Sequence, residues 1–257
     1  MESIAAHRGF SARHPEATRA AYQEVIAWSA ASGIAVSLEC DVHFSSDGAL
    51  ICLHDLTVDR TSNGTGLASD HTLAELQELD FGSWRLPDPT PDQRALVTLE
   101  EVLTMVRDAR AAGVPVSIAI ETKHPNSRGT EIEEEVALLL QRVGWDRAGS
   151  PVRIISFSLA GLIVAGRLLP ELERTLLVEM DLSPVCSGEL PEGVRIVGPD
   201  VRLLRQDPDF VARARAHGNE VHVWTVNTPT DLEYCRSLGA TGYTTDDPEL
   251  VASALSA

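Results

Sequence analysis

The stretch of sequence that decides the fold reads Leu38-Glu39-Cys40-Asp41-Val42-His43-Phe44-Ser45-Ser46-Asp47-Gly48-Ala49-Leu50-Ile51-Cys52-Leu53-His54-Asp55. Two apolar runs rich in β-branched residues flank its Asp47-Gly48 pair, a dipeptide typical of tight hairpin turns. Because only residues 42–49 separate the runs, a crossover helix does not fit between them. We therefore expect two antiparallel strands, the first within residues 34–44.

A two-residue turn at Asp47-Gly48 would set the register of this hairpin. Asp41 would then lie opposite His54, and Glu39 would point to the same face because side chains alternate along a strand. Two carboxylates and an imidazole would converge. The alternative for an isolated hairpin is an edge position with its polar face in water, so other parts of the chain have to decide.

The rest of the chain alternates between short apolar runs and amphipathic segments. Besides the first arm of the hairpin, strands are predicted at residues 3–6, 116–120, 152–156, 175–179, 195–198, 220–226 and 241–244. Helices are predicted at residues 17–31, 99–112, 131–143, 159–169, 207–217 and 228–238. Eight strand-helix units in 257 residues predict a single α/β domain over residues 1–257, a (β/α)8 TIM barrel. A doubly wound open sheet competes, but no Gly-x-Gly-x-x-Gly follows the first strand.

Residues 55–97 interrupt this alternation. Gly, Pro, Ser, Thr and Asp are frequent there, and the only helical pattern is the short segment 73–79. A segment of this length without strands predicts a lid or an insertion.

Polar residues gather where the predicted strands end, the face that carries the active site in a TIM barrel. They are His7 and Arg8, Glu39 and Asp41, Glu121 and Lys123, Ser156 to Ser158, Trp224 to Asn227, and Thr244 to Asp247. Each group alone has an ordinary structural explanation, such as core packing for His7 or Trp224 and helix capping for Asp246. Their one-sided placement predicts a shared site instead.

Three of these residues form a set of oxygen donors. Glu39, Asp41 and Glu121 bring no cysteine or clustered histidine with them, which suits one divalent cation, Mg²⁺ or Ca²⁺, better than zinc. Beside such an ion, Arg8 and Lys123 would form the basic pocket that an acidic protein needs to bind a phosphate.

An excess of acidic residues marks the whole chain. The 38 acidic and 21 basic residues give a net charge of −17, so we expect no binding to nucleic acid and no stable association with a membrane. No apolar run is long enough for a membrane span or a signal peptide before His7, so a cytoplasmic location is expected. The cysteines lack CxxC spacing and are expected to be reduced, with Cys40 and Cys52 on opposite faces of the hairpin.

Together, these motifs resemble those of the glycerophosphodiester phosphodiesterases, a family of phospholipase C-like TIM barrels. The likeness covers most of the chain, in the family's order: His7-Arg8-Gly9, Pro15-Glu16 with Thr18, Glu39-x-Asp41-Val42, Asp47-Gly48 before His54-Asp55, Asp59-Arg60-Thr61 with Asn63-Gly64, Glu121-x-Lys123, Ser156-Phe157, Trp224-Thr225-Val226-Asn227, and Thr245-Asp246 ahead of Pro248.

The resemblance implies metal-dependent hydrolysis of small-molecule glycerophosphodiesters to glycerol 3-phosphate and an alcohol. His7 and His54 would act as general acid and base, and Glu39, Asp41 and Glu121 would hold the cation.

The resemblance also extends to substrate contacts. Arg8 and Lys123 would bind the phosphate, and Phe157 and Trp224 would wall the alcohol pocket. Residues 55–97 would be the family's insertion over the mouth of the barrel. One position departs from the family's Pro-Glu-Asn-Thr, because Ala17 replaces the asparagine, and we expect this to affect fine positioning more than activity.

Two other functions fit part of the pattern. A phospholipase C- or D-like enzyme acting on a lysolipid or phosphoinositide headgroup would need the same residues. A metal-bearing binding module without turnover would be expected to lack a histidine or a carboxylate of the set, and this chain lacks neither. The sequence gives no indication of the oligomeric state. Ser156 and Ser158 stand outside any Gly-x-Ser-x-Gly motif, so no serine nucleophile is predicted.

Overall fold

The computed structural model describes residues 2–126 and 128–256 of the chain. Within these residues, eight parallel strands form a closed barrel, because the first strand pairs with both the second and the last. The barrel strands are β1 (Ser3–Ala6), β2 (Val36–Phe44), β4 (Val116–Thr122), β5 (Val152–Ser156), β6 (Glu173–Val178), β7 (Ile196–Pro199), β8 (Glu220–Val223) and β9 (Gly242–Thr245). A short antiparallel strand, β3 (Leu50–Cys52), lies beside β2. The predicted TIM barrel is confirmed.

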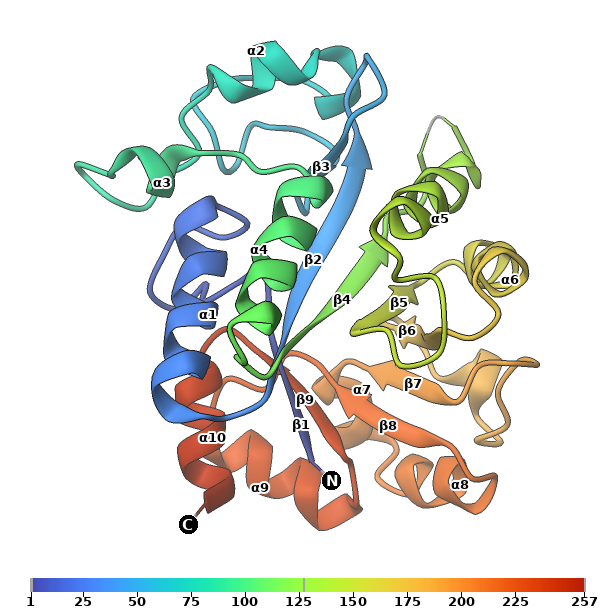
Figure 1. The fold of residues 1–257 in the computed structure, drawn as a ribbon. Helices are drawn as coiled ribbons and strands as arrows, with labels where there is room; N and C mark the ends of the chain where they lie inside the picture. Colours follow the sequence, from blue (N-terminus) through green and yellow to red (C-terminus); the bar gives the residue numbers. More distant parts are fainter. Residues whose placement is uncertain (1, 127, 257) are drawn as a thin grey trace.

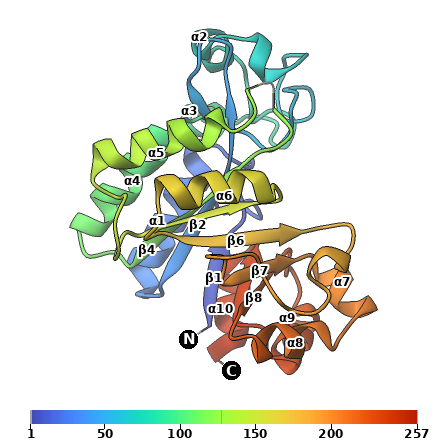
Figure 2. The ribbon, with the colours of Figure 1, turned by 90° about the vertical axis from the view of Figure 1, so that its right-hand side faces the viewer.

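Helices surround the barrel (Figures 1 and 2). They are α1 (Arg19–Ser32), α4 (Leu99–Ala111), α5 (Glu131–Val143), α6 (Leu159–Leu168), α7 (Val201–Gln206), α8 (Phe210–Ala216), α9 (Pro229–Leu238) and α10 (Pro248–Ser256). The sequence pattern missed α7 and α10. It also started α8 at residue 207 instead of Phe210. None of the helices in the described residues has the length and apolar character needed to cross a membrane.

The start of α1 is tied to the loop that carries His7 and Arg8. Thr18 caps the helix by accepting a hydrogen bond from the backbone N–H of Ala21, and the N–H of Ala17 donates to the carbonyl of Arg8 at 2.9 Å. The cap therefore fixes the loop after β1 as well as the helix.

The register of the β2–β3 hairpin differs from the prediction by one residue. The Cα partners are Val42–Cys52, His43–Ile51 and Phe44–Leu50. The backbone carbonyl of Asp41 accepts a hydrogen bond from the N–H of Leu53, so the expected pairing of Asp41 with His54 was wrong. His54 instead follows the end of the strand.

The loop of the hairpin explains the shift. Gly48 has a φ of +86° and donates its N–H to the carbonyl of Ser45, whose own N–H donates to the carbonyl of Ala49. The connection therefore has three residues and not two. The shift places Cys52 on the face of Cys40, contrary to the prediction, and both are buried free thiols.

Residues 55–97 fold beside the barrel end where β2 finishes (Figure 1). They contain a 3₁₀ turn (Ala68–Asp70) and the short helices α2 (Leu73–Gln77) and α3 (Pro91–Arg94). Their small apolar core consists of Ile51, Leu53, Val58, Ala68, Leu76, Phe81 and Leu96. Arg85 joins the segment to the loop after β1 by donating to the carbonyls of Ala12 and His14 at 2.5 and 2.7 Å.

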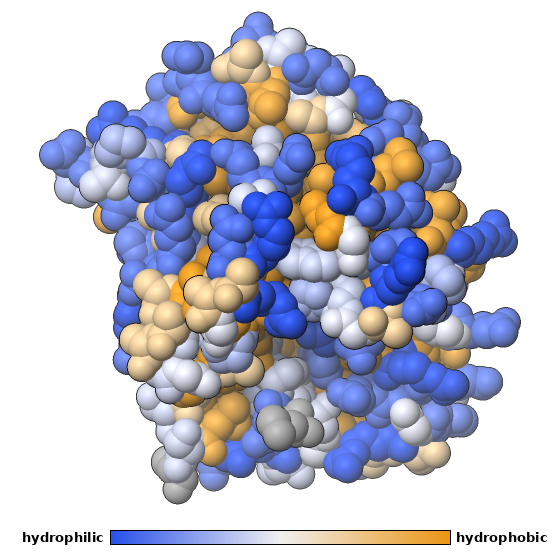
Figure 3. All heavy atoms as spheres, viewed as in Figure 1, coloured by the Kyte–Doolittle hydropathy of each residue, from blue (hydrophilic) through white to orange (hydrophobic). Residues whose placement is uncertain are grey.

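The surface is largely hydrophilic on the face shown in Figure 3. Apolar groups are interspersed among the hydrophilic side chains there. The layer between the barrel strands and the helices holds the main apolar core, including Leu38, Ile118 and Val221, each fully buried.

Candidate active site

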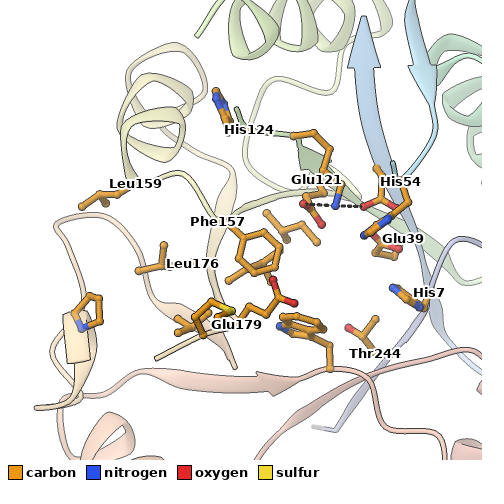
Figure 4. A pocket seen from close by; sticks show the side chains of 18 of the residues that line it. His7, Glu39, His54, Glu121, His124, Phe157, Leu159, Leu176, Glu179 and Thr244 are labelled. Carbon is orange, nitrogen blue, oxygen red and sulfur yellow. Dashed lines mark ion pairs between the residues drawn. The ribbon is translucent and has the colours of Figure 1, made fainter. Parts of the chain in front are cut away.

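A cavity of about 780 Å³ opens at the C-terminal ends of the barrel strands. Its lining includes every predicted site residue: His7, Arg8, Glu39, Asp41, His54, Glu121, Lys123, Phe157 and Trp224 (Figure 4). The barrel thus brings together side chains that are scattered along the sequence. The cavity has a charged half, beside β1, β2 and β4, and an aromatic half, beside β5, β6 and β8.

Three carboxylates form the centre of the charged half. Glu39 and Asp41 are alternate residues of β2, and Asp41 pairs in register with Glu121 of β4. One oxygen from each of the three lies within 4.8 Å of the others, and all three residues are buried. The prediction that these residues converge is confirmed by this geometry.

The carboxylates interact strongly with one another and with two cations. Burial and the adjacent Asp41 raise the pKa of Glu121 to about 8, and burial with the other two carboxylates raises the pKa of Glu39 well above its usual range. Burial acts in the same direction on Asp41, but Lys123 and Arg8 outweigh it and lower the pKa of that group. The cluster therefore favours added positive charge.

The basic side chains lie directly against the carboxylates. Lys123 Nζ is 2.8 Å from Asp41 Oδ1 and 2.7 Å from Glu121 Oε1, while Arg8 Nε is 3.3 Å from Asp41 Oδ2. The backbone N–H of Arg8 also donates to Glu39 Oε2 at 2.9 Å, from a residue with a φ of +56°.

The three carboxylates fit a divalent cation. Asp41 Oδ2 and Glu121 Oε1 are buried and accept no well-aligned hydrogen bond from the residues that the structure describes. Hard carboxylate oxygens with spare lone pairs are the donors that Mg²⁺ and Ca²⁺ prefer, and the set contains no sulfur or imidazole ligand.

Two histidines flank the carboxylates, and an aspartate holds each of them. His7 Nδ1 lies 2.7 Å from Asp246 Oδ1, and His54 Nδ1 lies 2.6 Å from Asp55 Oδ1. Because an ionised carboxylate only accepts hydrogen bonds, Nδ1 carries the proton in both neutral rings and Nε2 is the basic atom. Burial, helped by Lys123 and Arg8, lowers the pKa of His54.

The aspartates have their own supports, which the sequence did not reveal. Asp246 accepts hydrogen bonds from Ser11 Oγ at 3.0 Å and from Asn227 Nδ2 at 2.6 Å. From the sequence alone, Asp246 is as consistent with a helix cap as with a ligand, because its histidine partner is distant in sequence. Asp55 directly follows His54, but nothing in the sequence indicates that it orients its neighbour.

An ion network connects His54 with Arg8. Arg60 donates to Asp55 at 2.6 Å and to both oxygens of Glu16 at 2.7 and 2.9 Å, and Glu16 in turn accepts from Arg8 at 2.8 Å. His54 and Arg8 are therefore coupled through three intervening side chains, Asp55, Arg60 and Glu16.

Sequence reasoning missed two further histidines of the cavity. His43 shares the inward face of β2 with Asp41, and its Nε2 lies 3.2 Å from the carbonyl of His54. The alternation of β2 would have identified it. His124 follows Lys123, and its Nε2 lies 2.9 Å from Oε1 of the buried Glu133.

The aromatic half is built around Phe157 and Trp224. Their rings meet edge to face with centroids 5.5 Å apart, and Trp224 Nε1 donates to the carbonyl of Gly198 at 2.7 Å. Lys123 Nζ lies 6.0 Å from the Phe157 centroid, so the aromatic pair borders the charged half. Glu179, which the sequence did not single out, also lines this half.

Comparisons with known proteins agree with this geometry. Residues 7–250 match the model of the glycerophosphoryl diester phosphodiesterase family. A probable glycerophosphodiester phosphodiesterase 1 of Mycobacterium tuberculosis is 36% identical over 252 residues, covering 95% of this chain and 89% of the relative. A glycerophosphodiester phosphodiesterase of Bacillus subtilis is 33% identical over 257 residues, covering 95% of this chain and 83% of the relative.

A solved structure shows the same similarity. The Oleispira antarctica phosphodiesterase in complex with the product sn-glycerol-3-phosphate superposes with a TM-score of 0.81 and 25% identity. The match covers 99% of this chain and 97% of the other.

Proposed function

The chain belongs to the glycerophosphoryl diester phosphodiesterase family, and on that premise we propose that its cavity hydrolyses glycerophosphodiesters to glycerol 3-phosphate and an alcohol through two-histidine acid-base catalysis. As a member of this family the protein is an enzyme, a glycerophosphodiester phosphodiesterase. The observation that carries the mechanism is the pair of histidines, each held at Nδ1 by an aspartate, in the same cavity as the carboxylate cluster.

Glu39, Asp41 and Glu121 would hold one divalent cation, Mg²⁺ or Ca²⁺. When bound, such an ion supplies positive charge for the phosphate oxygens and for the charge that builds on them during the reaction. The buried oxygens of Asp41 and Glu121 that accept no well-aligned hydrogen bond from the described residues support this assignment.

Arg8 and Lys123 would bind and orient the phosphate. Both side chains are largely buried at the charged half, and their ion pairs with Asp41 keep them in place before substrate arrives. A phosphodiester anion placed here meets preorganised positive charge in a site that excludes much of the surrounding water.

The histidines would move the protons. A glycerophosphodiester carries a 2-hydroxyl next to its phosphoester oxygen, so this hydroxyl can attack phosphorus within the same molecule. One histidine takes the hydroxyl proton at Nε2 while the other protonates the oxygen of the departing alcohol. Water then opens the resulting five-membered cyclic phosphate with the roles reversed, which gives glycerol 3-phosphate.

A serine nucleophile is not needed in this scheme. Ser156 is fully buried and donates its hydroxyl to the carbonyl of Thr122 at 2.8 Å, so its oxygen does not face substrate. Ser158 caps α6 by accepting from the N–H of Gly161.

The test compares a glycerophosphodiester with its 2-deoxy analogue. The wild-type enzyme should release glycerol 3-phosphate from the former, as measured by a coupled assay, and should bind the latter as an inhibitor without turnover. A transient cyclic phosphate should be visible by ³¹P NMR. Brisk hydrolysis of the deoxy analogue would contradict the substrate's role as nucleophile, and failure to hydrolyse any glycerophosphodiester would contradict the proposed reaction.

A further inference from the structure

His43 lies in the reaction cavity but takes no part in the proposed mechanism. It shares the inward face of β2 with Glu39 and Asp41, and it is buried, with 5% of its surface exposed. It lies outside the carboxylate cluster. A polar ring is costly to bury without a hydrogen-bonding partner, so the partner of this ring indicates what it does.

The side chain of His43 makes one hydrogen bond in the described part of the chain. Its Nε2 lies 3.2 Å from the carbonyl oxygen of His54. Because a carbonyl oxygen only accepts hydrogen bonds, Nε2 carries a proton and donates it. The bond therefore connects a barrel strand with a residue that the mechanism uses as an acid or a base.

His54 and Asp55 follow the end of the hairpin, where strand pairing no longer holds the chain. The hydrogen bond nearest to them between the two arms runs from the N–H of Leu53 to the carbonyl of Asp41 at 3.0 Å. Beyond it, neither His54 nor Asp55 shares a hydrogen bond with another main-chain group of the described residues. Within residues 2–126 and 128–256, the ring of His43 is thus the one group that holds this main chain by a hydrogen bond.

The carbonyl that His43 holds belongs to the peptide unit that joins His54 to Asp55. This unit is planar, so its carbonyl and the N–H of Asp55 turn together. The contact of 2.6 Å between His54 Nδ1 and Asp55 Oδ1 spans the same unit from one side chain to the next. A rotation of the unit would change the geometry of that contact and, with it, the direction of His54 Nε2. His43 restrains this rotation.

The other histidine–aspartate pair has main-chain support of its own. The N–H of His7 donates to the carbonyl of Thr245 at 2.8 Å, and the N–H of Asp246 donates to Asn227 Oδ1 at 2.9 Å. Both chain segments of that pair are therefore fixed by the barrel. The hydrogen bond from His43 takes the place of this support at His54.

We propose that His43 is a positioning residue for His54: it holds the peptide between His54 and Asp55 so that His54 Nε2 faces the phosphate of the substrate. The inference rests on the proposed function, because that function assigns proton transfer to His54. In this role His43 does not contact the reacting atoms.

Two replacements of His43 separate its hydrogen bond from its packing. Phenylalanine keeps a flat ring without a donor, whereas the amide nitrogen of glutamine can stand close to the place of Nε2 and donate. His43→Phe should lower kcat by about tenfold with little change in KM, a usual loss when an orienting partner is removed. His43→Gln should recover most of this kcat. Equal losses in both variants, or a raised KM with an unchanged kcat in His43→Phe, would overturn the positioning role.

His71→Phe is the matched control. His71 Nε2 lies 3.1 Å from the carbonyl of Thr65, which is the same kind of hydrogen bond, but neither residue lines the cavity. The kcat and KM of this variant should equal those of the wild type. A fall in kcat as large as that of His43→Phe would contradict a role specific to His43.

A double-mutant cycle shows which histidine–aspartate pair His43 acts on. In Asp55→Asn the pair of His54 is already disrupted, so the addition of His43→Phe should lower kcat by less than about twofold. In Asp246→Asn the pair of His54 is intact, so the same addition should lower kcat by the full factor of about ten. Equal losses in the two backgrounds would overturn the assignment to His54.

A second pair of variants applies if circular dichroism shows that His43→Phe does not fold. The amide nitrogen of asparagine stands near the place of Nδ1 and does not reach the carbonyl of His54, whereas that of glutamine does. The kcat of His43→Asn should then be about tenfold below that of His43→Gln. Equal kcat values in these two variants would contradict the proposal.

Two measurements without substrate separate this inference from the proposed function. The imidazole ¹⁵N NMR signals of His54 should shift in His43→Phe while those of His7 stay unchanged, and unchanged His54 signals would overturn the inference. Calorimetry should give the same Mg²⁺ affinity for His43→Phe and wild type, and a loss of affinity equal to the loss in kcat would assign His43 to the carboxylates instead. If the wild type hydrolyses no glycerophosphodiester, the proposed function fails, and the NMR comparison still decides whether His43 orients His54.

Discussion

The two histidine–aspartate pairs have the same geometry, but one pair is distant in sequence and the other is adjacent. His7 and Asp246 are separated by 239 positions and meet where β1 pairs with β9. His54 and Asp55 are adjacent in sequence and lie at the border between the hairpin and the insertion. In both, a carboxylate oxygen lies within 2.7 Å of Nδ1.

The two aspartates differ in the side chains that hold them. Asp246 is held by the neutral side chains of Ser11 and Asn227 from the barrel, whereas Asp55 is held by Arg60, an ion that also joins Glu16. An imidazole can thus be oriented by the closure of a fold or by a local ion network. The His7–Asp246 pair depends on the pairing of β1 with β9. The His54–Asp55 pair depends on the ionised carboxylate of Asp55 and its contact with Arg60.

Removal of divalent cations should have the largest effect, because it acts on both histidine sites at once. Chelation with EDTA is expected to abolish turnover, and Mg²⁺ or Ca²⁺ should restore it. Glu121→Gln should weaken cation binding, measured by calorimetry, far more than it changes the thermal stability of the cation-free protein. Hydrolysis at the full rate by the cation-free enzyme would contradict the assignment of Glu39, Asp41 and Glu121.

Replacement of one histidine should have the next largest effect. His7→Ala and His54→Ala are each expected to lower kcat by about 10² to 10⁴, the usual contribution of one general acid or base. Circular dichroism should show that both variants fold. A normal kcat in either variant would mean that this histidine transfers no proton.

Replacement of the aspartates should distinguish the two supports. Asp246→Asn and Asp55→Asn are each expected to lower kcat by on the order of 10-fold to 100-fold, because the histidine loses its orienting charge. Asp55→Asn should also raise KM, since it loosens Arg60, Glu16 and through them the phosphate contact of Arg8. An equal rise of KM in both variants would show that the ion network does not reach Arg8.

Low pH should reduce the contribution of Asp55 to the unfolding free energy of the protein. Burial raises the pKa of this carboxyl, but hydrogen bonds from Arg60 and His54 outweigh it and lower the pKa to about 2. Because the folded pKa lies below the unfolded one, the stabilisation is complete above about pH 4 and is lost as the pH falls toward 2. The difference in unfolding free energy between wild type and Asp55→Asn, from urea titrations, should therefore shrink over that window. A constant difference would exclude this linkage.

The smallest effect is expected at Ala17, next to the Glu16 that connects Arg60 with Arg8. Ala17 has a φ of +57°, a conformation that costs a residue with a Cβ about 1 kcal/mol. Asparagine tolerates this conformation better than alanine, which gives a physical reason for the family's residue at this position. Ala17→Gly should raise the unfolding free energy by about 0.5 kcal/mol after the entropic cost of glycine. In the control Ala27→Gly, inside α1, stability should fall by about 1 kcal/mol.

The sequence was sufficient to place site residues that lie at or next to the C-terminal end of a predicted strand. Glu39, Asp41, Glu121 and Lys123 could be placed because parallel strands deliver their C-terminal residues to one face. The predicted hairpin register was wrong because Asp47-Gly48 fits both a two-residue and a three-residue loop, and Gly48 has a positive φ in either. The hydrogen bond from the N–H of Ser45 to the carbonyl of Ala49 distinguishes the three-residue loop.

Contacts between distant loops were beyond a single sequence. Nothing near Asp246 in the sequence indicates its hydrogen bond to His7, because the two residues are 239 positions apart. His54 entered the site although its predicted pairing was wrong, because the chain turns toward the cavity after β3 ends. A register prediction that was wrong by one residue therefore still placed His54 at the correct end of the barrel.

The seam between β1 and β9 also has a consequence for biosynthesis. The N–H of His7 donates to the carbonyl of Thr245 at 2.8 Å, so the ring of His7 meets Asp246 only after the last barrel strand has docked. A chain in which β9 has not docked lacks the hydrogen bond between His7 and Asp246, because Asp246 directly follows β9. Turnover therefore requires the barrel to be closed. During refolding, enzymatic activity should appear when β1 pairs with β9 and not with the earlier formation of the helices.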